Sequence, residues 1–379
     1  MQLLDLLDES RRQLEICNAC RYCEGYCAVF PAMERRTAFT NGDVEYLANL
    51  CHDCRACFYA CPFASPHEFA VNLPAVLSEV RSNTYTRHVW PAVVGRLATH
   101  AGKLIVVLAA ISLLIVFAYV LMTVGPAGLF GTQIGEGAFY RVVPHLAMAI
   151  PALAISAYVV VVMLAGGYRF WREVGGTVGE LLDIRSLWGA TVDAFELRYL
   201  RGGGDGCYYP ADRPSKSRVV LHSLVFYGFM AAFASTTIAF VFQAFLGVLP
   251  PYDYLSLPVV LGVIGGVAMT VGCTGLMLVK LRSDPAPAAS VMRSMDFAFL
   301  AILDLASITG LLVVAFRETA AMGVLLGLHL GVLGGLYVSL PYSKFVHVVY
   351  RYAAIIKHRI ESRREAAAVR AASVADVTT

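Results

Sequence analysis

Eight cysteines near the N-terminus form two runs of the same spacing. Each run follows the pattern C-x2-C-x2-C-x3-C, and a proline follows the second run. Thiolates at these intervals bind cubane [4Fe–4S] clusters, because two-residue gaps let one loop reach three iron atoms of the same cube. The cysteines of the two runs are Cys17, Cys20, Cys23 and Cys27, then Cys51, Cys54, Cys57 and Cys61.

The fourth cysteine of each run is carried away from its own loop by the following helical turn, and it therefore ligates the other cluster. This predicts a first cluster held by Cys17, Cys20, Cys23 and Cys61, and a second held by Cys51, Cys54, Cys57 and Cys27. The first run departs from the pattern, because Ala28 and not proline follows its last cysteine.

Disulfides and zinc are the alternative uses of these thiols. The first residues are charged and amphipathic, so we expect no signal peptide and a reducing compartment, which disfavours disulfides. Zinc ordinarily takes two C-x-x-C pairs and not two runs of four cysteines. The spacing therefore favours two [4Fe–4S] clusters.

The rest of the chain is strongly apolar. Hydrophobic residues make up 58% of the 379 residues and charged residues only 15%. Six stretches reach the roughly 20 residues needed to cross the hydrocarbon of a bilayer. We place these spans at about 101–124, 142–165, 219–247, 257–281, 296–316 and 320–349, the last projecting beyond the bilayer as a continuing helix. The predicted fold class is a membrane α-helical protein, a six-span bundle behind an N-terminal α-helical domain of the ferredoxin type with two [4Fe–4S] clusters.

Positive charges are distributed unevenly between the spans. Lys and Arg gather before span one, in the loop 166–218, between spans four and five, and after span six. Since such loops stay on the cytoplasmic side, both termini and this loop are predicted to be cytoplasmic in a multi-pass protein of a bacterial inner membrane. We expect a cluster domain at 1–96, a membrane domain at 97–352 and a tail at 353–379. Residues 178–200 have apolar positions at helical spacing, which predicts an amphipathic helix at the interface or under the cluster domain.

Four histidines lie in the predicted spans or at their ends, where a ligand-type side chain indicates function. His329 and His347 are five helical turns apart on span six, so their rings face one side of a continuous helix, about 27 Å from each other. His222 opens span three at the level of His347, and His145 opens span two nearer the level of His329. This predicts one or two b-type haems, held by His222 with His347 and by His145 with His329. Histidines that merely lie at the membrane interface are the alternative.

A quinone bound among the helices is the expected electron acceptor. Its reduction needs protons, for which the candidates are His100 and Lys103 (with His88) before span one, and Asp304 within span five. Asp304 alternatively serves as a neutral, hydrogen-bonded packing residue. We find no G-x-G-x-x-G after a strand, no P-loop and no nucleophile elbow, so the chain has no substrate-dehydrogenase site of its own. The expected partners are a flavoprotein, quinone and membrane lipid, and no nucleic acid.

The segments CNACRYCEGYC, CHDCRACFYACPF and LYVSLPYSKFVHVVYR resemble the tricarballylate utilisation protein B family, also called the CitB family. The resemblance runs the whole chain, and the third segment is also similar to the b-haem subunits of respiratory nitrate reductase and membrane heterodisulfide reductases. It implies that the chain reoxidises the reduced flavin of a separate tricarballylate dehydrogenase, and passes the electrons through clusters and haem to the quinone pool. The cysteines and histidines named above fall on the family's motifs.

Other functions stay open on the sequence. One alternative is electron flow in reverse, from quinol to a soluble reductase, as in heterodisulfide or fumarate reduction, because direction depends on potentials that the cluster environment sets. A membrane anchor whose clusters only assemble a complex is another alternative. Histidines at matched depth argue against it, because an anchor needs no such ligands. A channel or transporter would require charges along several spans, and only Asp304 fits.

Overall fold

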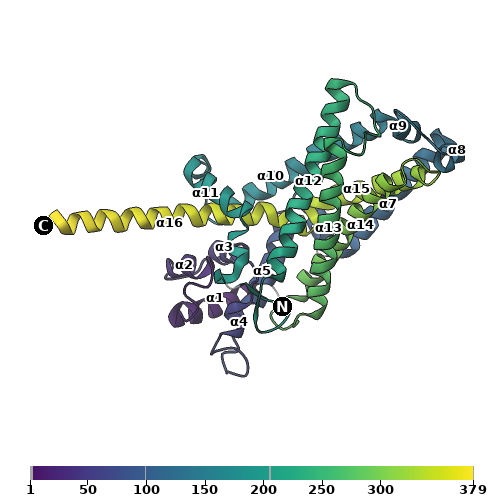
Figure 1. Ribbon diagram of the computed structural model, residues 1–379. Coiled ribbons are helices and arrows are strands. Elements are labelled where there is room, and N and C mark those ends of the chain that lie inside the picture. Colours follow the sequence, from purple (N-terminus) through teal and green to yellow (C-terminus); the bar gives the residue numbers. More distant parts are fainter. Residues whose placement is uncertain (1–2, 99, 205, 379) are drawn as a thin grey trace.

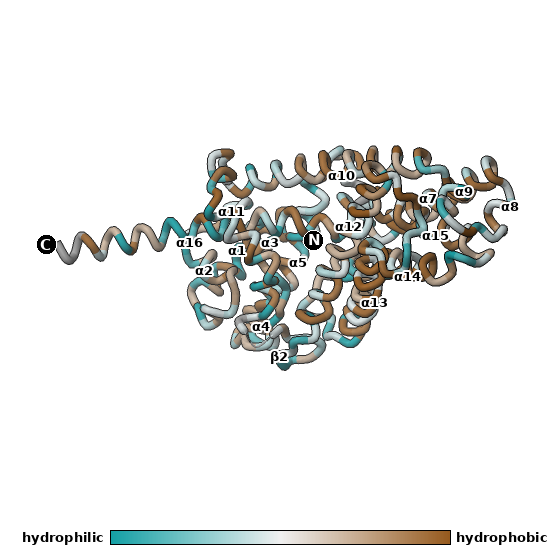
Figure 2. Tube along the Cα trace, turned by 45° about the horizontal axis from the view of Figure 1, so that its top comes forward, coloured by the Kyte–Doolittle hydropathy of each residue, from teal (hydrophilic) through white to brown (hydrophobic). Residues whose placement is uncertain are grey.

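The computed structural model describes residues 3–98, 100–204 and 206–378, and most of them are helical (Figure 1). Six of the described helices are long and apolar enough to cross a bilayer, which confirms the six-span membrane fold. These helices are α7 (Ala101–Thr123), α10 (His145–Glu173), α12 (Ser217–Leu246), α13 (Leu257–Arg282), α14 (Ser290–Ala315) and α15 (Met322–Ser339). Hydrophobic residues predominate along these helices, whereas hydrophilic residues are frequent in the N-terminal helices (Figure 2).

Six shorter helices precede the first span. They are α1 (Leu3–Cys20), α2 (Val29–Glu34), α3 (Asn41–Leu50), α4 (Ala56–Tyr59), α5 (Leu73–Arg87) and α6 (Ala92–Ala98). Helix α3 begins with a capping box, in which the Thr40 hydroxyl accepts from the Asp43 amide and the Asp43 carboxylate accepts from the Thr40 amide. Helix α5 is capped by the Asn72 side chain and has a proline in its first turn. These caps fix both helices that flank the second cysteine run.

The remaining elements connect the spans. At one end of the bundle lie α8 (Gly125–Phe130) and α9 (Ala138–Val142). The long loop after α10 contains η1 (Gly179–Leu182), α11 (Ile184–Phe195), η2 (Arg198–Gly204), and the antiparallel pair β1 (Cys207–Tyr208) and β2 (Pro214–Ser215). The amphipathic helix predicted in this loop forms as α11, which packs on the C-terminal helix α16 (His347–Thr378). Helix α16 extends away from the bundle (Figure 1).

The last predicted span is not one continuous helix. Helix α15 ends at Ser339, followed by the short turns η3 (Leu340–Tyr342) and η4 (Lys344–Val346), before α16 begins. Pro341 has no amide hydrogen, and its ring would clash with the carbonyl four residues earlier, which favours the end of the helix here. Ser343, in extended conformation, then separates η3 from η4. The prediction of a single helix over 320–349 is therefore wrong, and His329 and His347 have no common helix face.

The N-terminal helices share one hydrophobic core with the ends of α10 and α16. Leu14 and Tyr46 pack in the same buried cluster as Trp171 of α10 and Tyr350 of α16. A second core lies within the membrane bundle, where Cys273, Leu303 and Val332 are buried. Since the first core includes both sets of elements, the cysteine-bearing domain is packed firmly against the ends of two membrane-associated helices.

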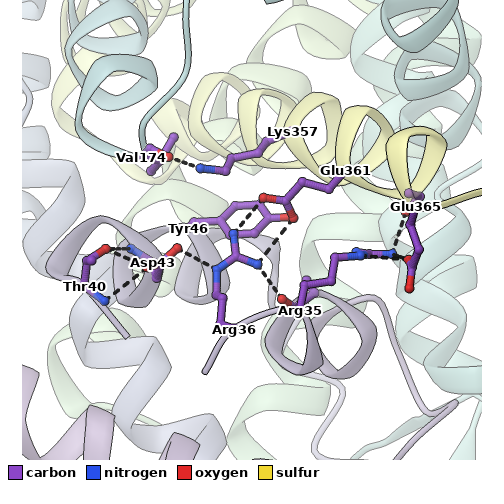
Figure 3. A network of polar contacts seen from close by, with 11 residues as sticks. Arg35, Arg36, Thr40, Asp43, Tyr46, Val174, Lys357, Glu361 and Glu365 are labelled. Carbon is purple, nitrogen blue, oxygen red and sulfur yellow. Dashed lines mark hydrogen bonds and ion pairs between the residues drawn. The ribbon is translucent and has the colours of Figure 1, made fainter. Parts of the chain in front are cut away.

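Ion pairs fasten α16 to the N-terminal helices (Figure 3). Arg36 donates to Asp43 at 2.5 Å and to Glu361 at 2.7 Å, and Arg35 donates to Glu365 at 2.6 Å. Lys357 donates to the carbonyl of Val174, which follows α10. Helix α16 thus runs without a break across residue 353, the predicted boundary between the membrane domain and the tail. It contacts the N-terminal helices as far as residue 365.

Candidate metal centres at the membrane boundary

The first predicted ligand set is gathered around a hollow. Cys17, Cys20, Cys23 and Cys61 all line it, together with apolar side chains such as Phe30. Burial, and then repulsion from Cys61, Cys23 and Cys20, raises the pKa of Cys17 to about 12. Cys61 of the second run therefore lies with the first three thiols of the first run, and their role as ligands of one cluster stays a prediction. Metal binding would deprotonate these thiols, since the thiolate is the ligand.

The thiols of the second predicted set also lie near one another, and they are more deeply buried than those of the first set. Burial, and then repulsion from Cys54, Cys51 and Cys27, holds the pKa of Cys57 well above its usual value. Burial, and then repulsion from Cys54 and Cys51, likewise holds the pKa of Cys27 well above its usual value. The structure thus brings Cys27 to the second loop, and not to the other members of its own run.

The two cysteine runs share one backbone feature. The residue after the second cysteine of each run, Arg21 or Arg55, has a positive φ of 55° or 66°. Such values are uncommon outside glycine, and here they curl the chain so that three thiols of one loop converge.

Among its described residues the structure forms no site for a single metal ion, because no three His, Cys, Asp or Glu side chains converge on one point. A cubane cluster needs no such point, since each of its thiolates binds a different iron.

Two arginines from membrane-associated helices hold the second cysteine loop. Arg351 of α16 donates to the Cys51 carbonyl at 2.9 Å, and Arg218 of α12 donates to the Asp53 carbonyl at 2.6 Å. Two further arginines, Arg55 and Arg81, are each only 3% exposed in the same region. The second loop therefore lies in a strongly positive, buried environment.

His222 and His347 lie one helical turn from these two arginines. Each histidine is four residues from its arginine, a rise of about 6 Å along α12 or α16. The two rings are near each other, since burial, then Arg351, Lys344 and His222, keep the pKa of His347 well below its usual value. The structure therefore brings the first predicted histidine pair together, directly beside the second cysteine loop.

The hydrogen bonds of this pair leave nitrogen atoms for a metal. His347 Nδ1 lies 2.6 Å from the Lys344 carbonyl, an acceptor, so Nδ1 carries the proton and Nε2 keeps its lone pair. Among the described residues, the buried Nδ1 of His222 has no hydrogen-bond partner. His347 has the orienting hydrogen bond usual for a metal-ligating histidine, and together with His222 it would hold a b-type haem, which stays a prediction.

The second predicted pair is less clearly arranged. Neighbours of both histidines, Met148 and Leu330, pack in one cluster, so His145 and His329 lie at the same end of the bundle. The ring of His145 lies 5.4 Å from that of Tyr140. His329 Nδ1, however, lies 3.1 Å from the Thr309 hydroxyl of α14, and its ring is in close contact with the backbone of that helix. A haem between these two histidines stays a prediction.

The glycines that follow His329 serve helix packing. A side chain on Gly335 would lie 2.5 Å from the Cα of Ala109, and one on Gly331 would lie 2.6 Å from Leu113. Both contacts are with α7, so these glycines allow close approach of two helices.

The four predicted proton donors do not form one site. His100 and Lys103 are exposed at the start of α7, where the neighbouring Gly102 packs against Ser294 of α14. Asp304 lies ten residues further along α14, about 15 Å deeper, and accepts a hydrogen bond from Thr274 at 2.8 Å. His88 is buried and lies 2.8 Å from Glu45 within the N-terminal core.

The sequence did not reveal how the long loop after α10 completes the second site. The Tyr208 amide donates to the Cys54 carbonyl at 2.8 Å, and the Tyr209 hydroxyl donates to Asp53 at 2.7 Å. Cys207, fully buried nearby, directs its thiol to the Leu200 carbonyl. No spacing rule links this loop to the cysteines, and Arg218 and Arg351 appeared only as members of positively charged segments.

Comparisons with known proteins agree with these observations. The family model described as "Citrate utilization protein B" matches residues 97–368, and its "Fer4-like domain" model matches residues 10–87. Citrate utilization protein B of Escherichia coli is 40% identical over 360 residues, which cover 94% of this chain and 93% of that protein. No solved structure matches the chain.

Proposed function

This chain belongs to the citrate utilization protein B family, and from that premise we propose that it conducts electrons from a reduced flavoprotein to a quinone in the membrane. The Fer4-like N-terminal domain with its grouped cysteines is consistent with iron–sulfur electron transfer in citrate or tricarballylate utilisation. The observation that carries the proposal is the position of His222 and His347, one turn from the arginines that bind the second cysteine loop.

The residues assigned to each group follow from this geometry. Cys17, Cys20, Cys23 and Cys61 would hold the first [4Fe–4S] cluster, and Cys27, Cys51, Cys54 and Cys57 the second. His222 and His347 would hold a b-type haem, with a second haem at His145 and His329 as a further proposal. When bound, these groups supply one-electron carriers, which a two-electron flavin donor needs in order to be emptied in single steps.

The donor is proposed to dock at the first cysteine set. Cys20 is exposed, and the adjacent Tyr22 is 62% exposed, whereas Cys54 of the second set is buried. Solvent exposure and neighbouring charge both shift the potential of an iron–sulfur cluster. The arginines around the second loop stabilise added negative charge there, which favours electron flow inward from the exposed set. This is the direction that a flavoprotein partner, such as a tricarballylate dehydrogenase, requires.

The side of the membrane is part of the same proposal. The positively charged segments support a cytoplasmic position for both termini and the loop 166–218 in a bacterium, where the flavoprotein would be found. Contacts of that loop with Cys54 keep it on the same side as the cysteines.

A stepwise reduction experiment tests the proposal. The full chain in lipid nanodiscs is mixed anaerobically with a reduced flavoprotein dehydrogenase, and cluster and haem absorbance are followed. Wild type should show reduced clusters and then reduced b-type haem bands. The variant His347→Ala should keep cluster reduction and lose those bands, while His67→Ala, which changes a histidine of the N-terminal domain, should behave as wild type. Unchanged haem bands in His347→Ala would contradict the assignment.

A further inference from the structure

Helix α11, in the long loop after α10, carries an apolar stripe that stays exposed in the described part of the chain. Ile184, Trp188 and Phe195 follow one another at intervals of four and seven residues, which places them on one face of the helix. Ile184 is 76% exposed and Trp188 70%, and Phe195 is exposed as well. Neighbouring large apolar side chains in water indicate an interaction surface, because burying them is favourable in proportion to their area.

The opposite face of α11 fixes the direction of this stripe. Ser186, Ala190 and Asp193 are buried on that face, and Asp193 accepts from Arg359 of α16 at 2.5 Å. Since α16 holds this face, the apolar stripe points away from α16. Figures 1 and 2 show α11 across α16 from α2 and α4, so the stripe does not face these two helices of the cysteine-bearing domain.

The C-terminal end of α11 lies at the level where α12 enters the hydrocarbon of the bilayer. Helix α12 has 30 residues, of which about 20, counted back from its far end at Leu246, suffice to cross the hydrocarbon. The membrane segment of α12 therefore begins near Tyr227, whose hydroxyl donates to the Phe195 carbonyl at 2.6 Å. The rings of Phe195 and Phe226 are 5.6 Å apart, and Tyr227 is itself exposed. The apolar stripe is thus continuous with the lipid-facing surface of a span.

Positive side chains lie at both ends of the stripe. Arg185 follows Ile184, and Arg198 comes three residues after Phe195; both arginines are exposed. Asp183, the acidic residue closest to Arg185 in the chain, is already paired with an arginine of α16. Exposed arginines next to an apolar helix face suit a layer of phosphate groups above acyl chains.

We propose that α11 lies in the lipid headgroup layer on the cysteine-bearing side of the membrane, with Ile184, Trp188 and Phe195 in contact with acyl chains. The partner is the bilayer surface, because the stripe continues the lipid-facing side of α12 and includes Trp and Phe, which favour this depth. Arg185 and Arg198 contact lipid phosphates. Of the two positions that the sequence predicts for this helix, this is the membrane interface, and it is independent of the electron-conducting role.

This lipid contact lies on the segment that covers the second cysteine loop. Through η2, α11 leads into β1, and the Tyr208 amide of β1 donates to the Cys54 carbonyl at 2.8 Å. The bilayer surface would therefore help to hold the loop after α10 in place over the second cysteine set.

Photocrosslinking from α11 tests the contact. Benzoylphenylalanine is incorporated in place of Trp188 in the full-length protein, which is irradiated in nanodiscs of phosphatidylglycerol and phosphatidylethanolamine, and adducts are identified by mass spectrometry. The positive control carries the same group in place of Leu114, which is 71% exposed within α7. The matched negative control carries it in place of Val369, which is 64% exposed where α16 extends away from the bundle (Figure 1).

Phospholipid adducts should form from position 188 with a yield within about threefold of that from position 114, and at least about tenfold above that from position 369. Adducts with a second copy of the chain in place of lipid would show that another protein surface covers the stripe. Lipid adducts from position 114 without any from position 188 would show that α11 lies outside the bilayer. Either result would overturn the proposal.

Fluorescence provides a second test that needs no photoreactive group. The chain has three tryptophans, and Trp171 is buried. Nanodiscs of lipid brominated in the upper acyl chain should quench a larger fraction of the emission in wild type than in Trp188→Phe, because bromine quenches tryptophan on contact. The variant keeps an aromatic ring in the stripe, so its fold is expected to be unchanged. An equal quenched fraction in the two proteins would show that Trp188 does not reach the acyl chains.

Discussion

At the scale of single residues, the spacing of the cysteines was enough to predict which thiols meet. The exchange of Cys27 and Cys61 between the loops is predicted by the motif; the structure brings Cys27 near Cys51 and Cys54, and Cys61 near Cys17, while their roles as ligands stay a prediction. The residues that surround the loops were not predictable. Arg218 and Arg351 reach backbone carbonyls from helices more than 150 residues away in the chain, and no local pattern records such contacts.

The exchange of cysteines makes a prediction about Cys61. Although it belongs to the second run, Cys61→Ser should remove the first cluster, because Cys61 lies with Cys17, Cys20 and Cys23. Iron measured in anaerobically purified protein should fall from about eight atoms to about four. Cys207→Ala should keep about eight, since that thiol bonds to a carbonyl near the second site. Loss of the second cluster's paramagnetic signal in Cys61→Ser, with the first retained, would contradict the ligand sets.

The charge around the second loop makes a prediction about potential. Arg351→Met removes both a positive charge and a hydrogen bond to the Cys51 carbonyl. The midpoint potential of the second cluster should fall by tens of millivolts, because added electrons lose a favourable electrostatic interaction. A redox titration followed by electron paramagnetic resonance measures this shift, with Arg370→Met in the exposed tail as control. An equal shift in both variants would show that the effect is not local.

At the scale of elements, length and hydropathy predicted all six spans, and the amphipathic pattern predicted α11. The error concerned span six, where apolar residues continue through Pro341 and conceal the end of the helix. The predicted pairing of His222 with His347 is unaffected by this correction, because it requires only that both residues lie at the same membrane surface. The pairing of His145 with His329 depends on how helices rotate about their axes, which a sequence pattern alone leaves undetermined.

The docking of α16 depends on a partly buried ion pair network. The Arg36 side chain is 10% exposed and bridges Asp43 and Glu361 (Figure 3). Arg36→Gln should destabilise the folded protein by about 3 kcal/mol, because two carboxylates lose their shared partner in a poorly hydrated site. The midpoint of heat unfolding in detergent should fall accordingly. Arg12→Gln removes an exposed pair with Glu9 and an exposed hydrogen bond to the Phe69 carbonyl, and should cost less than about 1 kcal/mol. Equal effects of the two changes would rule out a special role for Arg36.

At the scale of the whole molecule, the cysteine domain, the loop after α10 and the start of α16 meet at one end of the bundle. The sequence predicted this meeting through the distribution of Lys and Arg, since all positively charged segments were assigned to one side. It did not predict that these parts share a hydrophobic core with α10 and α16, because packing between distant segments leaves no periodic signal.

The assignment of both termini and the loop 166–218 to one side of the membrane leads to a topological prediction. A protease tag inserted after Gly204, and tags at either terminus, should all be cleaved in inverted membrane vesicles and protected in intact spheroplasts. A tag inserted in the turn 248–256, between α12 and α13, should behave in the opposite way. Cleavage of the N-terminal tag from outside intact spheroplasts would reverse the assigned orientation.

The most direct test of the electron-conducting role is a reduced-minus-oxidised optical spectrum of the anaerobically purified full-length protein, combined with iron analysis and haem extraction. The account predicts b-type haem bands on reduction, extractable haem, and about eight further iron atoms bound as clusters. Protein that is folded and intact but contains neither iron–sulfur clusters nor haem would contradict it.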